Sequence, residues 1–124
     1  MRTVLVLVLA FGLSGCTRWS LDRQMDTAYR SYEAGDCAKV MLALSKAERA
    51  SRARPYLQPE ISLLRGQCLE RQKLFVDAAQ TYEFILAGYP ASEYAFRARA
   101  RLETLRQLGH YPSVEPAKAR GAAL

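Results

Sequence analysis

Apolar residues recur at steps of three and four along most of this chain, a spacing that predicts helices. A clear run carries Val40, Met41, Leu44 and Ala47, and it lies between a Gly-Asp turn signal and a proline. No stretch alternates apolar and polar residues convincingly enough to indicate a strand. We therefore predict an all-α fold.

Glycine, proline and capping residues divide this pattern into five predicted helices. Gly35 with Asp36 is a turn signal, and Pro59 suits the first turn of a helix, because proline there loses no hydrogen bond. Ser92 is a good N-cap. The predicted helices cover about 25–34, 37–54, a segment beginning at 59, 76–87 and 92–108, with Leu21 as an alternative start of the first.

Residues 1–15 have the charge order of a secretory signal peptide. Arg2 precedes an apolar run from Val4 to Leu13, which is shorter than the roughly 20 residues that a membrane-spanning helix needs. The run ends in Leu13-Ser14-Gly15-Cys16, which resembles the lipobox of bacterial lipoproteins. This resemblance implies that residues 1–15 are removed and that Cys16 is lipidated. An uncleaved N-terminal anchor helix is the alternative.

The same resemblance implies a location. Thr17 rather than aspartate follows the cysteine, which by the sorting of enterobacterial lipoproteins implies the outer membrane, facing the periplasm. Residues 16–24 would then form a polar tether to a helical domain over 25–108. The tail, 109–124, is rich in Pro, Ala and Gly, and we expect it to be disordered.

The charge balance bears on the class of partner. The formal net charge is +6 and the pI is near 9.5, and loss of Arg2 with the signal peptide would leave +5. An exported chain seldom meets nucleic acid, so we expect none, and anionic lipid headgroups or an acidic protein face are the expected partners. No His/Cys cluster has metal-ligand spacing, so we predict no metal, no cofactor and no small-molecule substrate. His110 lacks an ordered neighbour to orient it as a general base, and we predict that the chain is not an enzyme.

The predicted helices form pairs with a recurring period, which suggests a solenoid. The second pair resembles a tetratricopeptide repeat. In that repeat small residues stand where the two helices cross, followed by an aromatic position, a small or apolar position and a terminal proline. Here Gly66 and Ala78 are the small residues, and Tyr82, Ile85 and Pro90 fill the other three positions in that order. The first pair has Ala28, Leu44 and Ala47 at corresponding positions. It departs from the pattern at Val40, where alanine is usual, and at Arg52, where proline is usual. The resemblance implies a short right-handed α-solenoid of about two repeats, with the fifth helix as a cap.

The segment 79–105 carries a narrower resemblance. Its order of aromatic, apolar, Tyr-Pro-x-Ser-x-Tyr-Ala and a basic helix is similar to the tetratricopeptide lipoproteins of the outer-membrane β-barrel assembly (Bam) complex and to repeats of Tol-Pal-associated periplasmic proteins. The Bam lipoprotein has more repeats than this chain. The resemblance implies a scaffolding role and no particular complex.

Two cysteines remain besides Cys16, namely Cys37 and Cys68. An oxidising compartment favours a disulfide between them. In a repeat stack the second helix of one pair runs antiparallel to the first helix of the next, which would place Cys37 beside Cys68. Two buried thiols acting as small apolar residues are the alternative.

Tetratricopeptide modules bind partners in a groove lined by the first helix of each pair. The resemblance places nine residues there: Met25, Tyr29 and Tyr32 from the first helix, Leu63, Gln67 and Glu70 from the third, and Tyr94, Arg97 and Arg101 from the fifth. Exposed Tyr and Arg are frequent interface anchors. The groove would have an aromatic end and a basic end and would receive an acidic peptide. Alternatively, a tyrosine fills the core and the arginines are only solvated.

These observations together predict a membrane-anchored periplasmic adaptor for protein–protein interaction in outer-membrane or secretion-system assembly. Its lipid would fix the location, and its groove would capture an envelope protein as a peptide or helix. One alternative is a pilotin-like chaperone for an outer-membrane subunit. Another is a structural subunit packed within an envelope machine.

Overall fold

A computed structural model describes the backbone of residues 2–112 and the side chains of residues 18–112. Within that range the chain is helical and has no strand, which confirms the predicted all-α class. The helices are α1 (Arg2–Glu33), α2 (Cys37–Ala50), the 3-10 helix η1 (Pro55–Leu57), α3 (Gln58–Arg71), α4 (Phe75–Gly88) and α5 (Glu93–Gln107). Two sets of predictions lie outside the described residues. They concern the side chains of the predicted signal peptide (1–15) and of Cys16, and the tail over 113–124.

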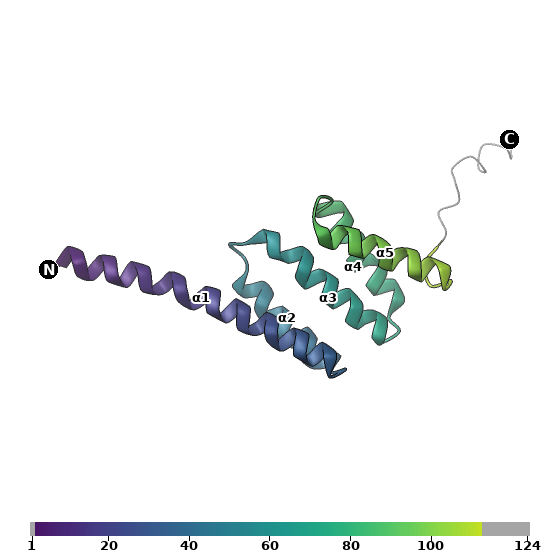
Figure 1. Cartoon of the computed structure of the whole chain (residues 1–124), viewed down its shortest axis with the longest axis horizontal. Helices are drawn as coiled ribbons and strands as arrows, with labels where there is room; N and C mark the ends of the chain where they lie inside the picture. The colour runs from purple at the N-terminus through teal and green to yellow at the C-terminus, as the bar shows by residue number, and fades with distance from the viewer. Residues whose placement is uncertain (1, 113–124) are drawn as a thin grey trace.

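Each helix packs on its neighbours in chain order. α1 packs along α2, α3 along α4, and α4 along α5, while α2 also contacts α3 and α3 contacts α5 (Figure 1). The short turns that join α1 to α2 and α3 to α4 make each of these pairs antiparallel. The N-terminal part of α1 extends beyond the other helices on one side of the domain (Figure 1).

Two hydrophobic cores meet at α3. The first lies between α1, α2 and α3 and includes Leu44 and Ile61, both fully buried. The second lies between α3, α4 and α5 and includes Tyr82 and Leu105, also fully buried. Because α3 supplies side chains to both cores, it is buried on more than one side, unlike an ordinary amphipathic surface helix.

Local signals read from the sequence set the turns and the close contacts. Gly35 has a φ of +78°, a conformation that glycine adopts without steric cost, and it ends the first helix as predicted. The Ser92 side chain accepts a hydrogen bond from the Ala95 N–H at 3.1 Å, which confirms it as the N-cap of α5. Gly66 lies directly against the Tyr82 ring, so its lack of a side chain permits the close crossing of α3 and α4.

Two predicted boundaries were wrong. Residues 17–24 do not form a tether, because α1 runs through them and Leu21 is only 2% exposed. Leu21 belongs to the same buried stripe as Met25 and Ala28, so helix and burial extend together. The second helix ends at Ala50 rather than near residue 54. Arg54, the residue before Pro55, is outside the helical conformation, as proline requires.

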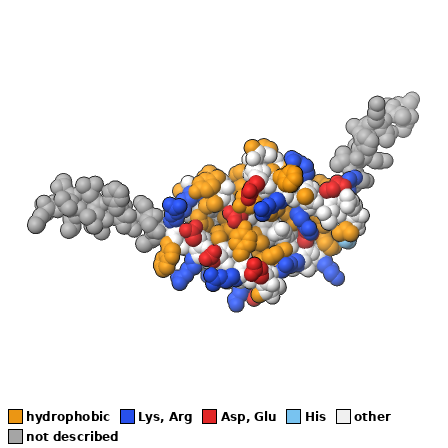
Figure 2. Space-filling model, viewed as in Figure 1, with side chains coloured by type: hydrophobic (Ala, Val, Ile, Leu, Met, Phe, Trp, Pro, Cys, Tyr) orange, Lys and Arg blue, Asp and Glu red, His pale blue; other side chains and the backbone are white. Residues whose placement is uncertain are grey.

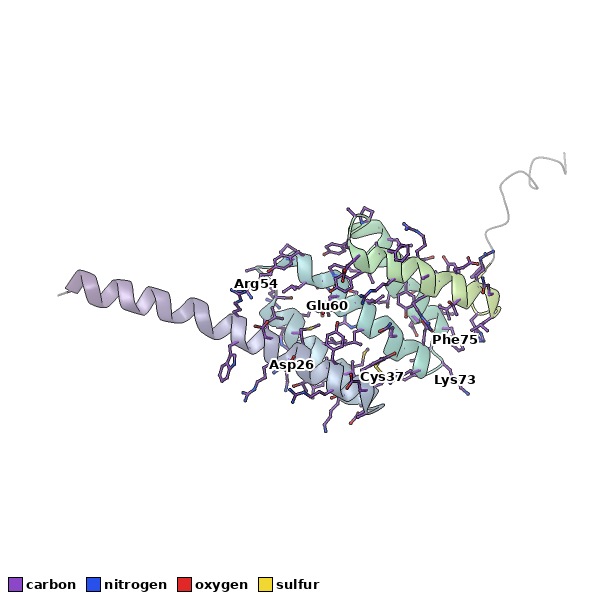
Figure 3. The ribbon with its side chains drawn as sticks, in the orientation of Figure 1. Asp26, Cys37, Arg54, Glu60, Lys73 and Phe75 are labelled. Atoms are coloured by element: carbon purple, nitrogen blue, oxygen red, sulfur yellow. A yellow bond between two sulfur atoms is a disulfide. The ribbon has the colours of Figure 1, made fainter. Side chains whose placement is uncertain are left out.

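Cys37 and Cys68 lie at disulfide distance, as the sequence predicted, with Cα atoms 5.5 Å apart. Cys37 is the first residue of α2, and Cys68 lies in the last turn of α3 (Cys37 is labelled in Figure 3). Both side chains are buried in the first core. The bond therefore ties one helix pair to the next.

Candidate partner-binding face

Residues of α1, α3 and α5 meet on one side of the domain. A cavity of about 280 Å³ lies between these three helices and is lined by Tyr32, Gln67, Glu70, Arg71 and Arg101. Four of the five had been predicted to line a binding groove; Arg71 had not. We call the side formed by α1, α3 and α5 the odd-helix face.

A buried carboxylate organises the floor of this cavity. The side chain of Glu70 is only 10% exposed and pairs with the guanidinium of Arg101, whose Nε donates to it at 2.9 Å. The Tyr82 hydroxyl, from α4, donates to the same carboxylate at 2.6 Å. Burial and this bond to Glu70 raise the pKa of Tyr82 well above its usual value. Glu70 thereby joins three helices, and the charge of Arg101 is largely compensated within the chain.

Arg71 links α3 to α1 at the edge of the same cavity. Its guanidinium carbon lies 3.6 Å from the centre of the Tyr32 ring, within the range of a cation–π contact. The same side chain also donates a hydrogen bond to the Tyr32 carbonyl. Arg71 was not predicted as a site residue, because a basic residue in the last turn of a helix is ordinary.

A second group of polar contacts crosses the odd-helix face around Glu60, in the first turn of α3 (Figure 3). The Tyr29 hydroxyl donates to Glu60 at 2.7 Å. The pKa of Tyr94 is raised to about 12, mainly because the side chain is partly buried and secondly because the Glu60 carboxylate is nearby. Tyrosines of α1 and α5 therefore approach one carboxylate of α3, which sequence analysis had treated only as a helix-terminus residue.

Arg97 stands beside this group with most of its side chain in solvent. The side chain is 60% exposed, and its only ion pair among the described residues is a long one of 3.9 Å to Glu93, one turn earlier on α5. Its guanidinium carbon lies 5.7 Å from the centre of the Tyr94 ring. Arg97 is consequently available to an incoming group in a way that Arg101 is not.

The remaining predicted groove residues lie in different surroundings. Met25 and Tyr29 line an adjacent cavity of about 320 Å³ that also contains Leu57 and Glu60. Leu63 does not line the face: it is 5% exposed and packs in the second core. Leu63 and Leu64 are adjacent in α3 and both are buried, Leu63 in the second core and Leu64 in the first.

The face also lacks the predicted division into an aromatic end and a basic end. Tyr29 and Tyr94 come together at Glu60, and Tyr32 lies under Arg71. Aromatic and charged side chains thus alternate across the helices. Figure 2 shows the same mixture of acidic, basic and apolar groups over the surface that it views.

The described residues show few other chemical groupings. Within residues 18–112, no three side chains of His, Cys, Asp or Glu are placed to hold a metal ion. His110 stacks on Phe75 with ring centres 3.8 Å apart. Among the described residues, no helix is both long and apolar enough to span a membrane.

Comparison with known proteins found no match among protein-family models, curated proteins or solved structures.

Proposed function

We propose that the chain is a periplasmic adaptor, held at the outer membrane by lipid on Cys16, that captures a segment of an envelope protein on its odd-helix face. The proposal combines the lipobox-like sequence with the arrangement of the helices. It further holds that α1–α2 and α3–α4 are two tetratricopeptide-type repeats and that α5 is the cap.

The helix contacts support the repeat assignment. α1 and α2 pack as one pair and α3 and α4 as the next, while α5 covers the second pair. Gly66 and Tyr82 touch where the helices of the second pair cross, at the positions that the tetratricopeptide resemblance assigned to a small and an aromatic residue. A solenoid needs such a close crossing in each pair to stack the next one.

The observation that carries the binding proposal is the cavity to which α1, α3 and α5 all contribute. Its carboxylate is already paired with Arg101. Arg71 is exposed, although it stacks on Tyr32 and donates to the Tyr32 carbonyl, and Arg97, outside the cavity lining, is exposed with a single long ion pair among the described residues. Gln67, in the same cavity, offers both a donor and an acceptor. A peptide or helix with acidic side chains next to apolar ones fits these groups best.

A double charge reversal tests this face. Arg71→Glu with Arg97→Glu should abolish recovery of the partner after crosslinking in envelopes, because two donors become repulsive to an acidic segment. The matched control is Lys73→Glu with Arg99→Glu, which changes the charge equally at exposed positions two residues further along the chain. Neither position lines the cavity, and a step of two residues places Arg99 on the other side of α5 from Arg97. Equal recovery with both double variants would refute the binding site.

The anchoring part of the proposal has its own test. Cys16→Ser should move the protein from the membrane fraction to the soluble periplasmic fraction, because the acyl chains supply the attachment. Mass spectrometry of the wild-type protein should find a mature chain that starts at an acylated Cys16. Membrane retention of the serine variant would favour the uncleaved anchor helix.

Exposed aromatic residues favour a second candidate, a structural subunit whose outer helix surfaces are covered by neighbours. Phe96 on α5 is 72% exposed, and Phe84 on α4 is 49% exposed. Both lie outside the cavity between α1, α3 and α5. If Phe96→Ser loses the partner while Arg71→Glu with Arg97→Glu retains it, the structural role is the better account.

A further inference from the structure

One end of the domain combines basic and aromatic side chains beside the N-terminal extension of α1. We call it the basic end and define it by Arg49, Arg52, Arg54 and Tyr56, around the turn from α2 to α3. Leu57 of this turn and Ala50 of α2 pack against the core that holds Leu21. The basic end is therefore fixed next to a residue only five positions from Cys16.

The positive charge at this turn is not compensated locally. No acidic residue occurs between Arg49 and Glu60 in the sequence. Arg49 and Arg52 are exposed and Arg54 is half-buried. Within the described residues, none of the ion pairs involves any of the three arginines.

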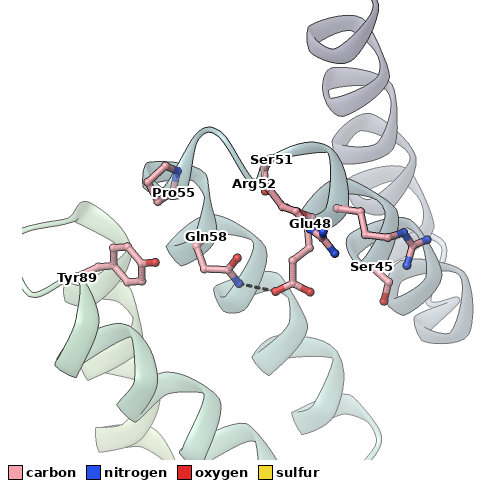
Figure 4. Close-up of a pocket in the computed structure, with 8 residues that line it drawn as sticks. Ser45, Glu48, Ser51, Arg52, Pro55, Gln58 and Tyr89 are labelled. Atoms are coloured by element: carbon pink, nitrogen blue, oxygen red, sulfur yellow. Dashed lines mark hydrogen bonds between the residues drawn. The ribbon is translucent and has the colours of Figure 1, made fainter.

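A surface hollow of about 440 Å³ opens between these arginines and the end of α4. Arg49 and Arg52 line it together with Ser51, Gln58 and Tyr89 (Figure 4). Its one acidic group, Glu48, already accepts from Gln58 at 2.7 Å and pairs with Arg65 at 3.0 Å. The hollow thus presents free cationic groups and neutral hydrogen-bonding groups to solvent.

Tyr56 lies in the same turn as the arginines, and Trp19 lies on α1 about 200° around the helix from the buried Leu21, on the outward side of that helix. Trp19 is 69% exposed and Tyr56 is 67% exposed. The Arg23 guanidinium carbon lies 5.1 Å from the Trp19 ring. Exposed Trp and Tyr together with arginine are the residue types that settle at a membrane–water interface, where an apolar ring and a polar group are both solvated well.

Acidic residues of α1 lie near the basic end, but within the described residues none of them forms an ion pair with its arginines. Asp22 and Asp26 lie on α1 near the basic end, and Asp26 pairs with Arg30 at 3.8 Å. At the opposite end of the domain the turn residues are mixed, because Asp36 caps α2 and Lys73 follows α3. The turn from α2 to α3, which lies beside the extension of α1 (Figure 1), thus carries three arginines and no acidic residue over positions 49–59.

We propose that the basic end docks on the headgroups of anionic phospholipids and so orients the anchored domain. This inference rests on the attachment part of the proposed function, since docking matters only for a chain held near a bilayer. Arg49, Arg52 and Arg54 would approach lipid phosphates, and Tyr56 would lie at headgroup level. Docking would leave the cavity of the odd-helix face open to the periplasm.

Single-tryptophan reporters can measure this docking, because Trp19 is the only tryptophan in the chain. In a Trp19→Phe background, Tyr56→Trp places the reporter in the basic end, and Leu108→Trp places a control at an exposed position after α5. The full chain, purified from bacterial membranes, is reconstituted into phosphatidylcholine vesicles with or without phosphatidylglycerol. Flotation reports attachment, and quenching by brominated lipid reports contact of the reporter with the bilayer.

Docking predicts that the reporter at position 56 is quenched only on vesicles with phosphatidylglycerol, and less so in high salt. Replacing Arg49, Arg52 and Arg54 together with glutamine should shift the docking equilibrium by on the order of 100-fold, at about five-fold for each charge. The control replaces Lys39, Lys73 and Arg99, which are exposed elsewhere, and should leave quenching unchanged.

The outcomes separate docking from attachment. Flotation without quenching at position 56, equal quenching on both kinds of vesicle, or quenching that survives the triple arginine variant would each overturn docking alone. Quenching at position 108 equal to that at position 56 would also overturn it, since the domain would then have no preferred orientation. A chain that floats on neither kind of vesicle would count against attachment and docking together.

Discussion

Replacing Gly66 with alanine should force α3 and α4 apart. A Cβ atom at this position would lie 2.5 Å from Cε1 and 2.9 Å from Cζ of Tyr82, well inside van der Waals contact. The ring cannot easily move away, because Tyr82 is fully buried and its hydroxyl is bonded to Glu70. Relief must therefore come from a shift of the helix pair itself.

The magnitude follows from two opposing effects. Overpacking a close-packed contact costs about 1–3 kcal/mol, and the fixed ring places this site at the upper end of that range. Alanine regains about 1 kcal/mol through its better helix propensity. The net loss in the free energy of unfolding should be about 2 kcal/mol, which for a domain of this size lowers Tm by roughly 8–16 °C.

Thermal and urea denaturation followed by circular dichroism would measure this loss. Gly88→Ala is the matched control, because a Cβ there meets no atom within 4 Å, and its Tm should be unchanged or slightly raised. In a Tyr82→Leu background the cost of Gly66→Ala should shrink by at least about 1 kcal/mol, since the clashing ring atoms are gone. A Gly66→Ala variant as stable as the wild type would refute the close crossing of α3 and α4.

Three further predictions concern the disulfide, the buried ion pair and the tyrosine cluster. Replacing Cys37 and Cys68 with alanine should lower the free energy of unfolding by about 3–4 kcal/mol in urea denaturation, because the bond closes a sequence separation of 31 residues. If reductant leaves the urea midpoint of the wild type unchanged, this prediction is wrong. Arg101→Ala should lower the free energy of unfolding by about 2 kcal/mol in the same assay, because it leaves the carboxylate of Glu70 without its cation. Adding Glu70→Gln to this variant should recover part of the lost stability. No recovery would argue against the ion pair. Between pH 10 and about 12 the folded chain retains a proton on Tyr94 that the unfolded chain has released, so the free energy of unfolding should fall as pH rises through this window. Alkaline absorbance difference titrations against Tyr94→Phe should show that Glu60→Gln lowers the pKa of Tyr94, and an unchanged pKa would show that burial alone raises it.

Helix positions and their ends were largely readable because their causes are local. The cap at Ser92 and the left-handed turn at Gly35 depend on a few neighbouring residues and matched the prediction. The boundary at Pro55 was misplaced because an apolar and basic run before it continues the helical pattern past Ala50, where the helix stops. Pro55 restricts only Arg54, so it does not account for the end at Ala50.

The candidate site was only partly readable. Tyr32, Gln67, Glu70 and Arg101, four of the nine residues predicted for the groove, line one cavity. Leu63 was assigned to the groove by the tetratricopeptide resemblance, whereas it is buried in the second core. Glu60 was overlooked as a site residue because a glutamate in a first helical turn has an adequate local explanation, favourable charge at the positive helix end.

The sequence by itself determined that the chain is helical and where most turns fall, because periodicity, glycine conformation and capping act over a few residues. It also indicated which two cysteines could pair, because only Cys37 and Cys68 remain besides Cys16. Only the tertiary structure decided that α3 serves two cores, that Glu70 is neutralised by Arg101, and that three arginines of one turn stand beside the extension of α1. These facts depend on helix crossings between segments far apart in the chain. Small packing choices, such as the contact of Gly66 with Tyr82, set those crossings, and no local pattern encodes them.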